Sequence, residues 1–223
     1  MTRRHLRHAF YALCRLASAE GLSALTAVRY FNVPDISRAG GLILASNHQS
    51  YLDPPLVSVS IDWPLNFLAQ DGLFRVPGFG TVIRLLGAHP LKRGQADRQA
   101  IKAAMEVLRA GEALIVFPEG TRTQDGRISP FKPGVGAIAL RCGVPILPAC
   151  VEGAFECWPR SRVLPWPGRV AVAYGTMVRP EGMDAQQMTL AVEQQVRLLQ
   201  QRLRCYLGRP EILEVMERSD SSG

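Results

Sequence analysis

From residue 41 onward, short apolar runs alternate with stretches of helical periodicity, and each run ends at Gly, Pro or Asn. This alternation is typical of an α/β fold. Almost entirely apolar runs predict buried strands, whereas the alternating segment Arg169–Tyr174 predicts a half-exposed strand. The buried strands are expected at Leu42–Ser46, Leu65–Ala69, Ala113–Phe117 and Pro145–Val151.

Two later segments predict clear helices. Asp97 is a suitable N-cap for a helix that ends just before Gly111. The residues that share its apolar face are Ile101, Ala104, Met105 and Leu108. A second helix is expected from Asp184 to about Tyr206. Beyond it, residues 208–223 form a polar C-terminal tail.

The N-terminal segment, residues 1–38, has a different character from the domain expected at 39–207. Apolar residues at helical spacing over His5–Phe31 predict two short helices interrupted near Gly21. The first helix is basic and contains no acidic residue before Glu20, which suits a helix lying on anionic lipid headgroups. An ordinary helix packed on the core satisfies the same periodicity.

Composition narrows the class of protein. The chain has 223 residues, 47% of them hydrophobic and 20% charged, which is enough for a folded core. Its net charge of +7 favours partners that carry phosphate, whether nucleic acid, anionic lipid or a small substrate. Five cysteines without a CxxC pair predict neither a disulfide framework nor a zinc site, and favour a reducing compartment. We expect no transmembrane helix and no secretory signal.

One candidate site follows the strand at Leu42–Ser46, where His48 precedes Asp53 by five positions. Ligands bind where strands end in open α/β sheets. A turn that folds Asp53 onto one ring nitrogen of His48 would leave the other nitrogen free to act as a base. Alternatively, Asp53 caps a helix that begins at Pro54, and His48 is an ordinary loop residue.

A second candidate site follows the strand at Ala113–Phe117. Gly120 permits a tight turn, and Glu119 can accept a hydrogen bond from a hydroxyl or orient an arginine. Arg122 and Lys132 are residue types that bind phosphate. A solvated turn with surface charges is the alternative. A third patch, residues 87–94, places the two cations Lys92 and Arg93 at a predicted strand end.

The order of these motifs resembles that of the PlsC-type glycerolipid acyltransferases. The matching blocks are NHxxxxD (Asn47, His48, Asp53), an arginine block ending at Arg93, FPEGTR (Phe117–Arg122) and VPI-x-P (Val144–Pro148). The resemblance covers about residues 41–175. It implies a mixed, mainly parallel sheet flanked by helices. One departure is Ala69–Leu73, which lacks the lysine and glutamate that are usual in the family.

The resemblance also implies a mechanism. His48 would be the general base that activates an acceptor hydroxyl for attack on an acyl-CoA or acyl-ACP thioester, and Asp53 would orient it. The acceptor, 1-acyl-sn-glycerol-3-phosphate or a similar lipid, would become phosphatidic acid. The residues expected to bind its phosphate and glycerol are Arg93, Glu119, Gly120, Arg122 and Lys132, with Asn47 and Lys92 as secondary candidates. The thioester is a co-substrate, and neither a cofactor nor a metal is expected.

A lipid acceptor further implies contact with a membrane phospholipid surface, and hence a cytoplasmic, peripheral location on the inner face of the cell membrane. Besides the N-terminal segment, Trp158 and Trp166 are candidate anchors, unless their rings fold inward. A nucleic-acid partner is not expected, because the cations are dispersed and no aromatic-basic module is present. Two alternatives remain: the same chemistry on another lysophospholipid or amino-lipid, and a non-catalytic lipid-binding protein of the same fold.

Overall fold

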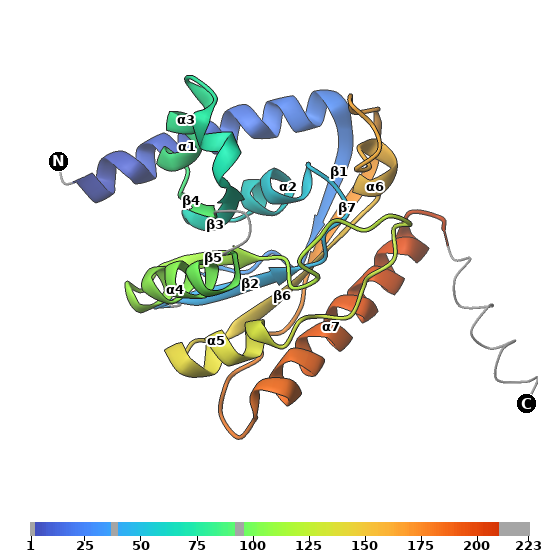
Figure 1. The fold of residues 1–223 in the computed structure, drawn as a ribbon. Coiled ribbons are helices and arrows are strands. Elements are labelled where there is room, and N and C mark those ends of the chain that lie inside the picture. Colours follow the sequence, from blue (N-terminus) through green and yellow to red (C-terminus); the bar gives the residue numbers. More distant parts are fainter. Residues whose placement is uncertain (1–2, 37–39, 92–95, 210–223) are drawn as a thin grey trace, which may run out of the picture.

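A seven-stranded sheet forms the centre of the computed structural model, which describes residues 3–36, 40–91 and 96–209 (Figure 1). The strands are β1 (Thr26–Phe31), β2 (Leu42–Ser46), β3 (Leu65–Gln70), β4 (Ala88–Leu91), β5 (Ala113–Val116), β6 (Ile146–Glu152) and β7 (Gly168–Tyr174). Their spatial order is β1-β7-β6-β2-β5-β3-β4, and all neighbouring pairs are parallel except β6 and β7. The prediction of a mixed, mainly parallel sheet is confirmed.

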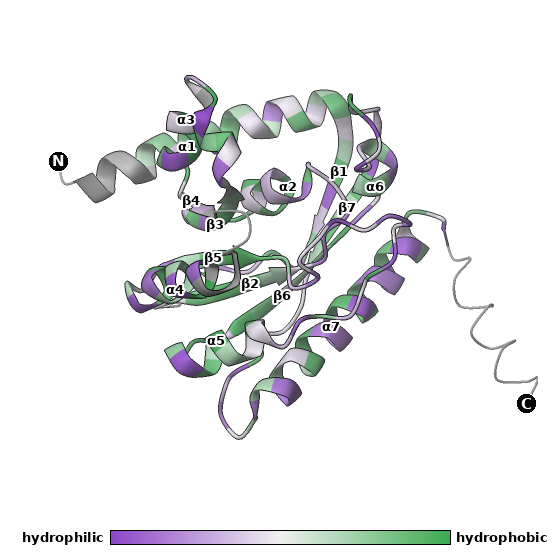
Figure 2. Cartoon of the chain, viewed as in Figure 1, coloured by the Kyte–Doolittle hydropathy of each residue, from purple (hydrophilic) through white to green (hydrophobic). Residues whose placement is uncertain are grey.

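Helices cover both faces of this sheet. They are α1 (Arg3–Leu25), α2 (Asp53–Ser60), the 3-10 helix η1 (Asp71–Arg75), α3 (Phe79–Leu85), α4 (Ala96–Arg109), α5 (Gly134–Cys142), α6 (Ala154–Cys157) and α7 (Ala185–Tyr206). One core cluster joins α4, α5 and α7 to the sheet, and a second joins α1, α2 and α6 to the opposite face. The hydrophobic colouring of the central strands in Figure 2 marks the layer that both groups of helices bury.

The N-terminal segment differs from the prediction. The two short helices are one continuous helix, α1, that passes through Gly21, and residues 26–31 form a strand instead of the end of a helix. This strand pairs with β7 from Thr26 opposite Gly168 to Phe31 opposite Ala173. Its apolar residues continue the helical spacing of α1, so the pattern concealed a strand that only pairing with a distant segment stabilises. Among the described residues, no helix is both long and apolar enough to cross a bilayer.

Strand β7 is more enclosed than its alternating sequence predicts. Residues 170–174 are buried, whereas we expected a half-exposed strand. The reason is its position, since β1 and β6 flank it and both core clusters contain its side chains. Because helices cover both faces of this interior strand, its less apolar positions are buried as well, and the alternating sequence does not mark a solvent-exposed face.

The two helices predicted with clear boundaries are present. Asp184 caps α7 through a capping box in which its carboxylate accepts from the Gln187 N–H group at 2.8 Å. Helix α4 begins at Ala96, so Asp97 lies within its first turn and is not the expected cap. Gly111 follows the end of α4 with a φ of +75°, as its predicted position beyond that helix requires.

Candidate active site

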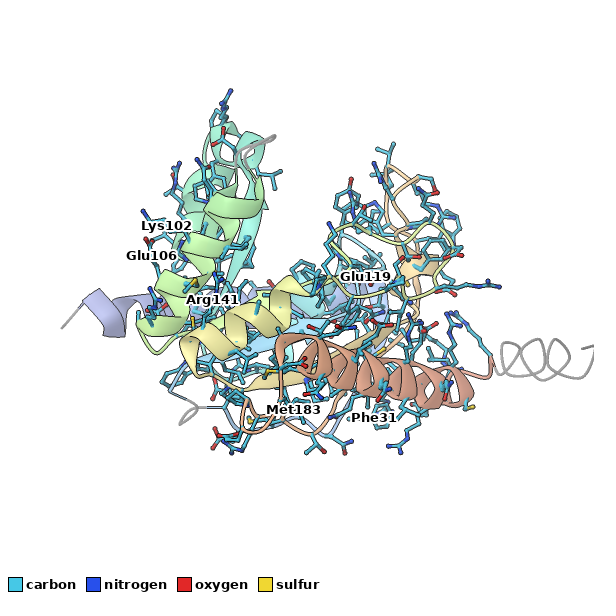
Figure 3. All side chains as sticks on the ribbon, turned by 60° about the horizontal axis from the view of Figure 1, so that its bottom comes forward. Phe31, Lys102, Glu106, Glu119, Arg141 and Met183 are labelled. Carbon is cyan, nitrogen blue, oxygen red and sulfur yellow. The ribbon has the colours of Figure 1, made fainter. Side chains whose placement is uncertain are left out.

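Three neighbouring parallel strands bring the predicted site together. Strand β2 lies between β5 and β6, so the carboxyl ends of all three meet at one edge of the sheet. The segment that follows β2 carries His48, and the segment that follows β5 carries Glu119. Figure 3 labels Glu119 at this edge. The two candidate sites of the sequence are therefore one site.

His48 and Asp53 form the predicted pair. The Nδ1 atom of His48 lies 2.8 Å from Oδ2 of Asp53. The imidazole stacks on the Phe117 ring, with the centroids 4.0 Å apart and the planes 19° apart. With Nδ1 held by the carboxylate, Nε2 is the nitrogen that can accept a proton, and the His48 side chain is 19% exposed.

Asp53 contacts His48 and the turn that precedes it, and it is not the cap residue of α2. The cap residue of α2 is Leu52, and no side chain caps that end of the helix. Oδ2 of Asp53 instead accepts the N–H groups of Gln49 at 2.6 Å and Ser50 at 2.7 Å. Burial raises the pKa of Asp53, while the contact with His48 and these two N–H groups oppose the rise.

Asn47 connects the site to strand β6. Its side chain is fully buried. The amide nitrogen donates to the Val151 carbonyl at 2.9 Å, and the amide oxygen accepts the Val151 N–H group at 2.8 Å. Both ends of the amide are thus occupied by the main chain of β6. This geometry fixes where the loop that carries His48 leaves the sheet.

Glu119 binds backbone groups rather than an arginine or a hydroxyl. Its Oε1 accepts the His48 N–H group at 2.7 Å, and its Oε2 accepts the Ser129 N–H group at 2.8 Å. The Thr123 N–H group donates to the His48 carbonyl at 2.8 Å, so the two loops are joined in both directions. Burial raises the pKa of Glu119, opposed mainly by its bond from Ser129. This carboxylate therefore holds the backbone of His48 against the loop that follows β5.

The predicted cations lie beside this pair of loops. Gly120 has a φ of +74°, and a Cβ atom there would lie 2.5 Å from the Nζ atom of Lys132, so Lys132 packs over the glycine. The guanidinium of Arg122 lies 3.5 Å from the centroid of the Tyr51 ring. Its Nη1 atom is shielded from solvent and has no hydrogen-bond partner among the described residues. The Tyr51 ring therefore holds the Arg122 guanidinium in place.

Two predicted cations cannot be placed relative to the site, and one depression lies away from it. Lys92 and Arg93, the cations of the third patch, lie outside the described residues. A depression of about 330 Å³ between α4 and α5 is lined by Lys102, Glu106 and Arg141, which Figure 3 shows well apart from Glu119. In the part of the chain that the structure describes, no cluster of three or more His, Cys, Asp or Glu residues could hold a metal ion.

Sequence reasoning missed a buried polar network behind the site. Glu152, at the end of β6, accepts from Gln49 at 3.0 Å, Gln200 at 2.8 Å and Arg204 at 3.1 Å. The same three side chains donate to the carbonyl of Gly126. The network ties α7 to both loops of the site. The three side chains that donate to Glu152 are 48 to 103 residues from it in sequence, so no local pattern marked them.

Comparison with known proteins agrees with this geometry. Residues 27–152 match the family model described as Acyltransferase. Over 119 residues, the chain is 37% identical to a chloroplastic 1-acyl-sn-glycerol-3-phosphate acyltransferase of Brassica napus, covering 52% of this chain and 34% of that protein. It is 32% identical over 143 residues to the 1-acyl-sn-glycerol-3-phosphate acyltransferase of Pseudomonas aeruginosa, covering 63% and 55%. The chain thus spans about a third to a half of these relatives.

A solved structure is similar over more of the chain. The crystal structure of the 1-acyl-sn-glycerophosphate acyltransferase PlsC from Thermotoga maritima superposes with a TM-score of 0.83 at 30% sequence identity. The superposition covers 92% of this chain and 83% of that one. The family model spans the strands that carry the His48 and Glu119 loops. The chain belongs to the acyltransferase family.

Proposed function

We propose that this protein transfers a fatty acyl group from a thioester to the free hydroxyl of 1-acyl-sn-glycerol-3-phosphate, which yields phosphatidic acid. The observation that carries the proposal is the 2.8 Å contact between His48 and Asp53 at the sheet edge that also holds Arg122. The names of the relatives from B. napus, P. aeruginosa and T. maritima support the choice of acceptor.

The proposed reaction uses His48 as a general base. Nε2 takes the proton of the acceptor hydroxyl as its oxygen attacks the thioester carbonyl carbon. The C–S bond of the resulting intermediate then breaks, and the thiolate leaves with the proton that the imidazolium returns. Asp53 stabilises that imidazolium and fixes the tautomer that leaves Nε2 unprotonated at the start. An ester and a free thiol are formed without a covalent enzyme intermediate.

Ser50 has no nucleophilic role in this mechanism. Its hydroxyl donates to the Trp158 carbonyl at 2.8 Å and accepts the Leu52 N–H group at 3.1 Å. These bonds fix the turn between His48 and Asp53, so Ser50 has a structural role.

We assign the acceptor phosphate to Arg122 and Lys132. The guanidinium of Arg122, held over the Tyr51 ring, and the position of Lys132 over Gly120 support this assignment. A guanidinium can contact phosphate oxygens through two donors at once. Arg93 and Lys92 remain proposed phosphate ligands on sequence grounds alone, and Glu119 and Asn47 are assigned positioning roles through the backbone contacts described above.

The donor is an acyl-CoA or acyl-ACP thioester, and the acceptor is presented at a phospholipid surface on the cytoplasmic side. Helix α1 supports this membrane contact because Leu13 and Leu16 are 65% and 61% exposed. Arg15, in contrast, is turned toward the protein, where it bonds the Val59 carbonyl and pairs with Asp62 at 3.0 Å. The exposed apolar side chains of α1 would therefore provide its lipid contact.

One observation supports a different acceptor lipid. Where the family usually has a lysine, this chain has Gln70 at the end of β3, followed by η1. The lost cation favours a lysophospholipid or amino-lipid that needs one phosphate contact fewer. Competition between lysophosphatidate and these lipids in one assay would distinguish the two proposals.

The test is release of free thiol from acyl-CoA and from acyl-ACP by the purified protein, with lysophosphatidate in mixed micelles. We expect acceptor-dependent release that falls about 10²–10⁴-fold in His48→Ala and in His48→Gln, with unchanged thermal unfolding. If either variant retains more than about a tenth of the rate, the base assignment is wrong. If the wild type releases no thiol with any of these acceptors, the non-catalytic lipid-binding alternative is favoured.

A further inference from the structure

The loop between α6 and β7, Trp158–Pro167, exposes an apolar tip. The exposed fractions are 86% for Val163, 73% for Leu164 and 67% for Trp166, the three highest among the large apolar side chains of the described residues. Single exposed apolar residues are ordinary, but three within four positions form a patch. Such a patch indicates a surface that contacts something other than water.

The loop is held in one conformation despite this exposure. The Trp166 N–H group donates to the Cys157 carbonyl at 2.7 Å, and the Trp158 indole Nε1 donates to the Arg162 carbonyl at 3.1 Å. Three prolines, Pro159, Pro165 and Pro167, further restrict the backbone. The apolar side chains are therefore presented by a preorganised turn, so insertion would cost little ordering entropy.

The charged residues within the loop and at the start of β7 are all basic, and Glu156, just before the loop, is paired with Arg209. Arg160, Arg162 and Arg169 are exposed, and the sequence contains no acidic residue from 157 to 180. Tryptophan is enriched at membrane–water interfaces, and arginines beside it can pair with lipid phosphates. A fluid, anionic lipid surface accepts protruding apolar side chains without the complementary pocket that a protein partner would need.

The base of the loop touches the proposed acceptor site. The Trp158 and Tyr51 rings have centroids 5.2 Å apart, and the Tyr51 ring also contacts the guanidinium of Arg122. The Ser50 hydroxyl bonds the Trp158 carbonyl, as described above. The loop also lies on the same side of the sheet as α1 (Figure 1). A lipid surface that receives the tip would therefore lie beside Arg122.

We propose that Trp158–Pro167 is a second membrane-docking element, which inserts Val163, Leu164 and Trp166 into an anionic phospholipid surface and brings the phosphate-binding Arg122 to that surface. The inference rests on the proposed function, because it places a lipid acceptor at Arg122. It adds to α1 a contact that is contiguous with the site.

Two measurements test the docking. In the first, phosphatidylglycerol vesicles with brominated acyl chains are added to wild type and to Trp166→Phe, and tryptophan emission is recorded. We expect quenching that Trp166→Phe largely removes. In the second, co-sedimentation with these lipids compares wild type, a triple variant (Val163→Ser, Leu164→Ser, Trp166→Ser) and a control with Leu190→Ser and Leu198→Ser on α7. We expect a roughly tenfold loss of partitioning in the triple variant and less than about twofold in the control.

Several results would overturn the proposal. They are equal sedimentation of the triple variant and wild type, absence of Trp166 quenching, or failure of the wild type to bind the vesicles. A short-chain lysophosphatidate below its micellar concentration separates this outcome from failure of the proposed function, because the triple variant should acylate that monomeric acceptor normally. If its rate instead falls with acyl-ACP and not with acyl-CoA, the loop binds the acidic carrier protein and the membrane assignment is wrong.

Discussion

The loop that carries His48 and the loop Trp158–Pro167 are neighbours with opposite relations between polarity and burial. In the first, Asn47, Gln49, Ser50 and Asp53 are polar and at most 1% exposed. In the second, the apolar side chains of Val163, Leu164 and Trp166 are 67% to 86% exposed. Polar groups are buried where their hydrogen bonds hold His48 in position, and apolar groups are exposed where we propose that a lipid surface covers them. One edge of the fold thus separates the chemistry from the proposed membrane contact.

The carboxylates show the same contrast. Burial raises the pKa values of Asp53, Glu119 and Glu152. Asp125, on the exposed part of the loop after β5, has a lowered pKa instead, chiefly because its carboxylate accepts the Arg127 N–H group. In the buried group, desolvation outweighs the hydrogen bonds, and in the exposed residue the hydrogen bonds dominate. Buried acids of this kind are positioned by structure at an energetic cost.

The largest expected effect on activity comes from replacing the buried carboxylate of Asp53. Asp53→Asn preserves size but removes the charge that stabilises the imidazolium, so kcat should fall by about 10²–10⁴-fold. The KM for the acceptor should change little, because Asp53 does not contact it in the proposed mechanism. Steady-state kinetics measures both constants. A kcat within about threefold of wild type would mean that Asp53 is only a structural acceptor for backbone N–H groups.

Asn47→Ala should act on stability more than on chemistry. It leaves both the N–H group and the carbonyl of Val151 without their buried partners, which should lower the free energy of unfolding by about 2–4 kcal/mol. Urea denaturation measures the loss. Asn47→Asp is the matched control, since it keeps an acceptor for the N–H group and should fall between the alanine variant and wild type. Equal stability of all three proteins would contradict the bridging role.

Tyr51, whose ring lies between Trp158 and Arg122, allows a test of how Arg122 is supported. Tyr51→Leu removes the ring beneath Arg122, and the loss of a cation–π contact of roughly 0.5–2 kcal/mol should raise the acceptor KM by about 2- to 30-fold. Tyr51→Phe retains the ring and should behave as wild type. Initial rates at varied acceptor concentration give both KM values. An unchanged KM in Tyr51→Leu would show that Arg122 is held by other contacts.

The smallest effect concerns the pH dependence of stability at Glu152. Because its pKa is raised in the folded protein, the folded state retains a proton that the unfolded state has already released. Wild type should therefore lose stability relative to Glu152→Gln as the pH rises from the unfolded pKa of about 4.3 through the folded pKa, by less than about 1.4 kcal/mol per pH unit. Denaturation curves at several pH values measure the difference. If wild type instead gains stability relative to Glu152→Gln as the pH rises, the ion pair with Arg204 outweighs the desolvation of Glu152.

Local signals in the sequence predicted much of the fold and of the site. The apolar runs at β2, β3, β5 and β6 indicated strands because both faces of those strands are buried, and the Asp184 cap marked the start of α7. His48 and Asp53 were identifiable because they lie five positions apart within one turn. Features that depend on neighbours in sequence were thus open to prediction.

Features that depend on distant partners were not. Strand β1 was mistaken for helix because its identity comes from pairing with β7, about 140 residues away. The bond between Glu119 and the His48 backbone spans 71 residues, and that between Glu152 and Gln49 spans 103. Tyr51 lies within the NHxxxxD block, but only its ring contacts show that it supports Arg122.

The sequence by itself indicated strands β2, β3, β5, β6 and β7, the pairing of His48 with Asp53, and the family to which these motifs point. Tertiary structure decided that the two candidate loops lie together, that Glu119 accepts the His48 N–H group, and that the loop Trp158–Pro167, with its exposed tip, contacts Tyr51 through Trp158. The physical reason is that short-range hydrogen bonds and burial patterns are encoded in consecutive residues. Contacts between loops, by contrast, depend on the order of β2, β5 and β6 in the sheet, which no local segment encodes.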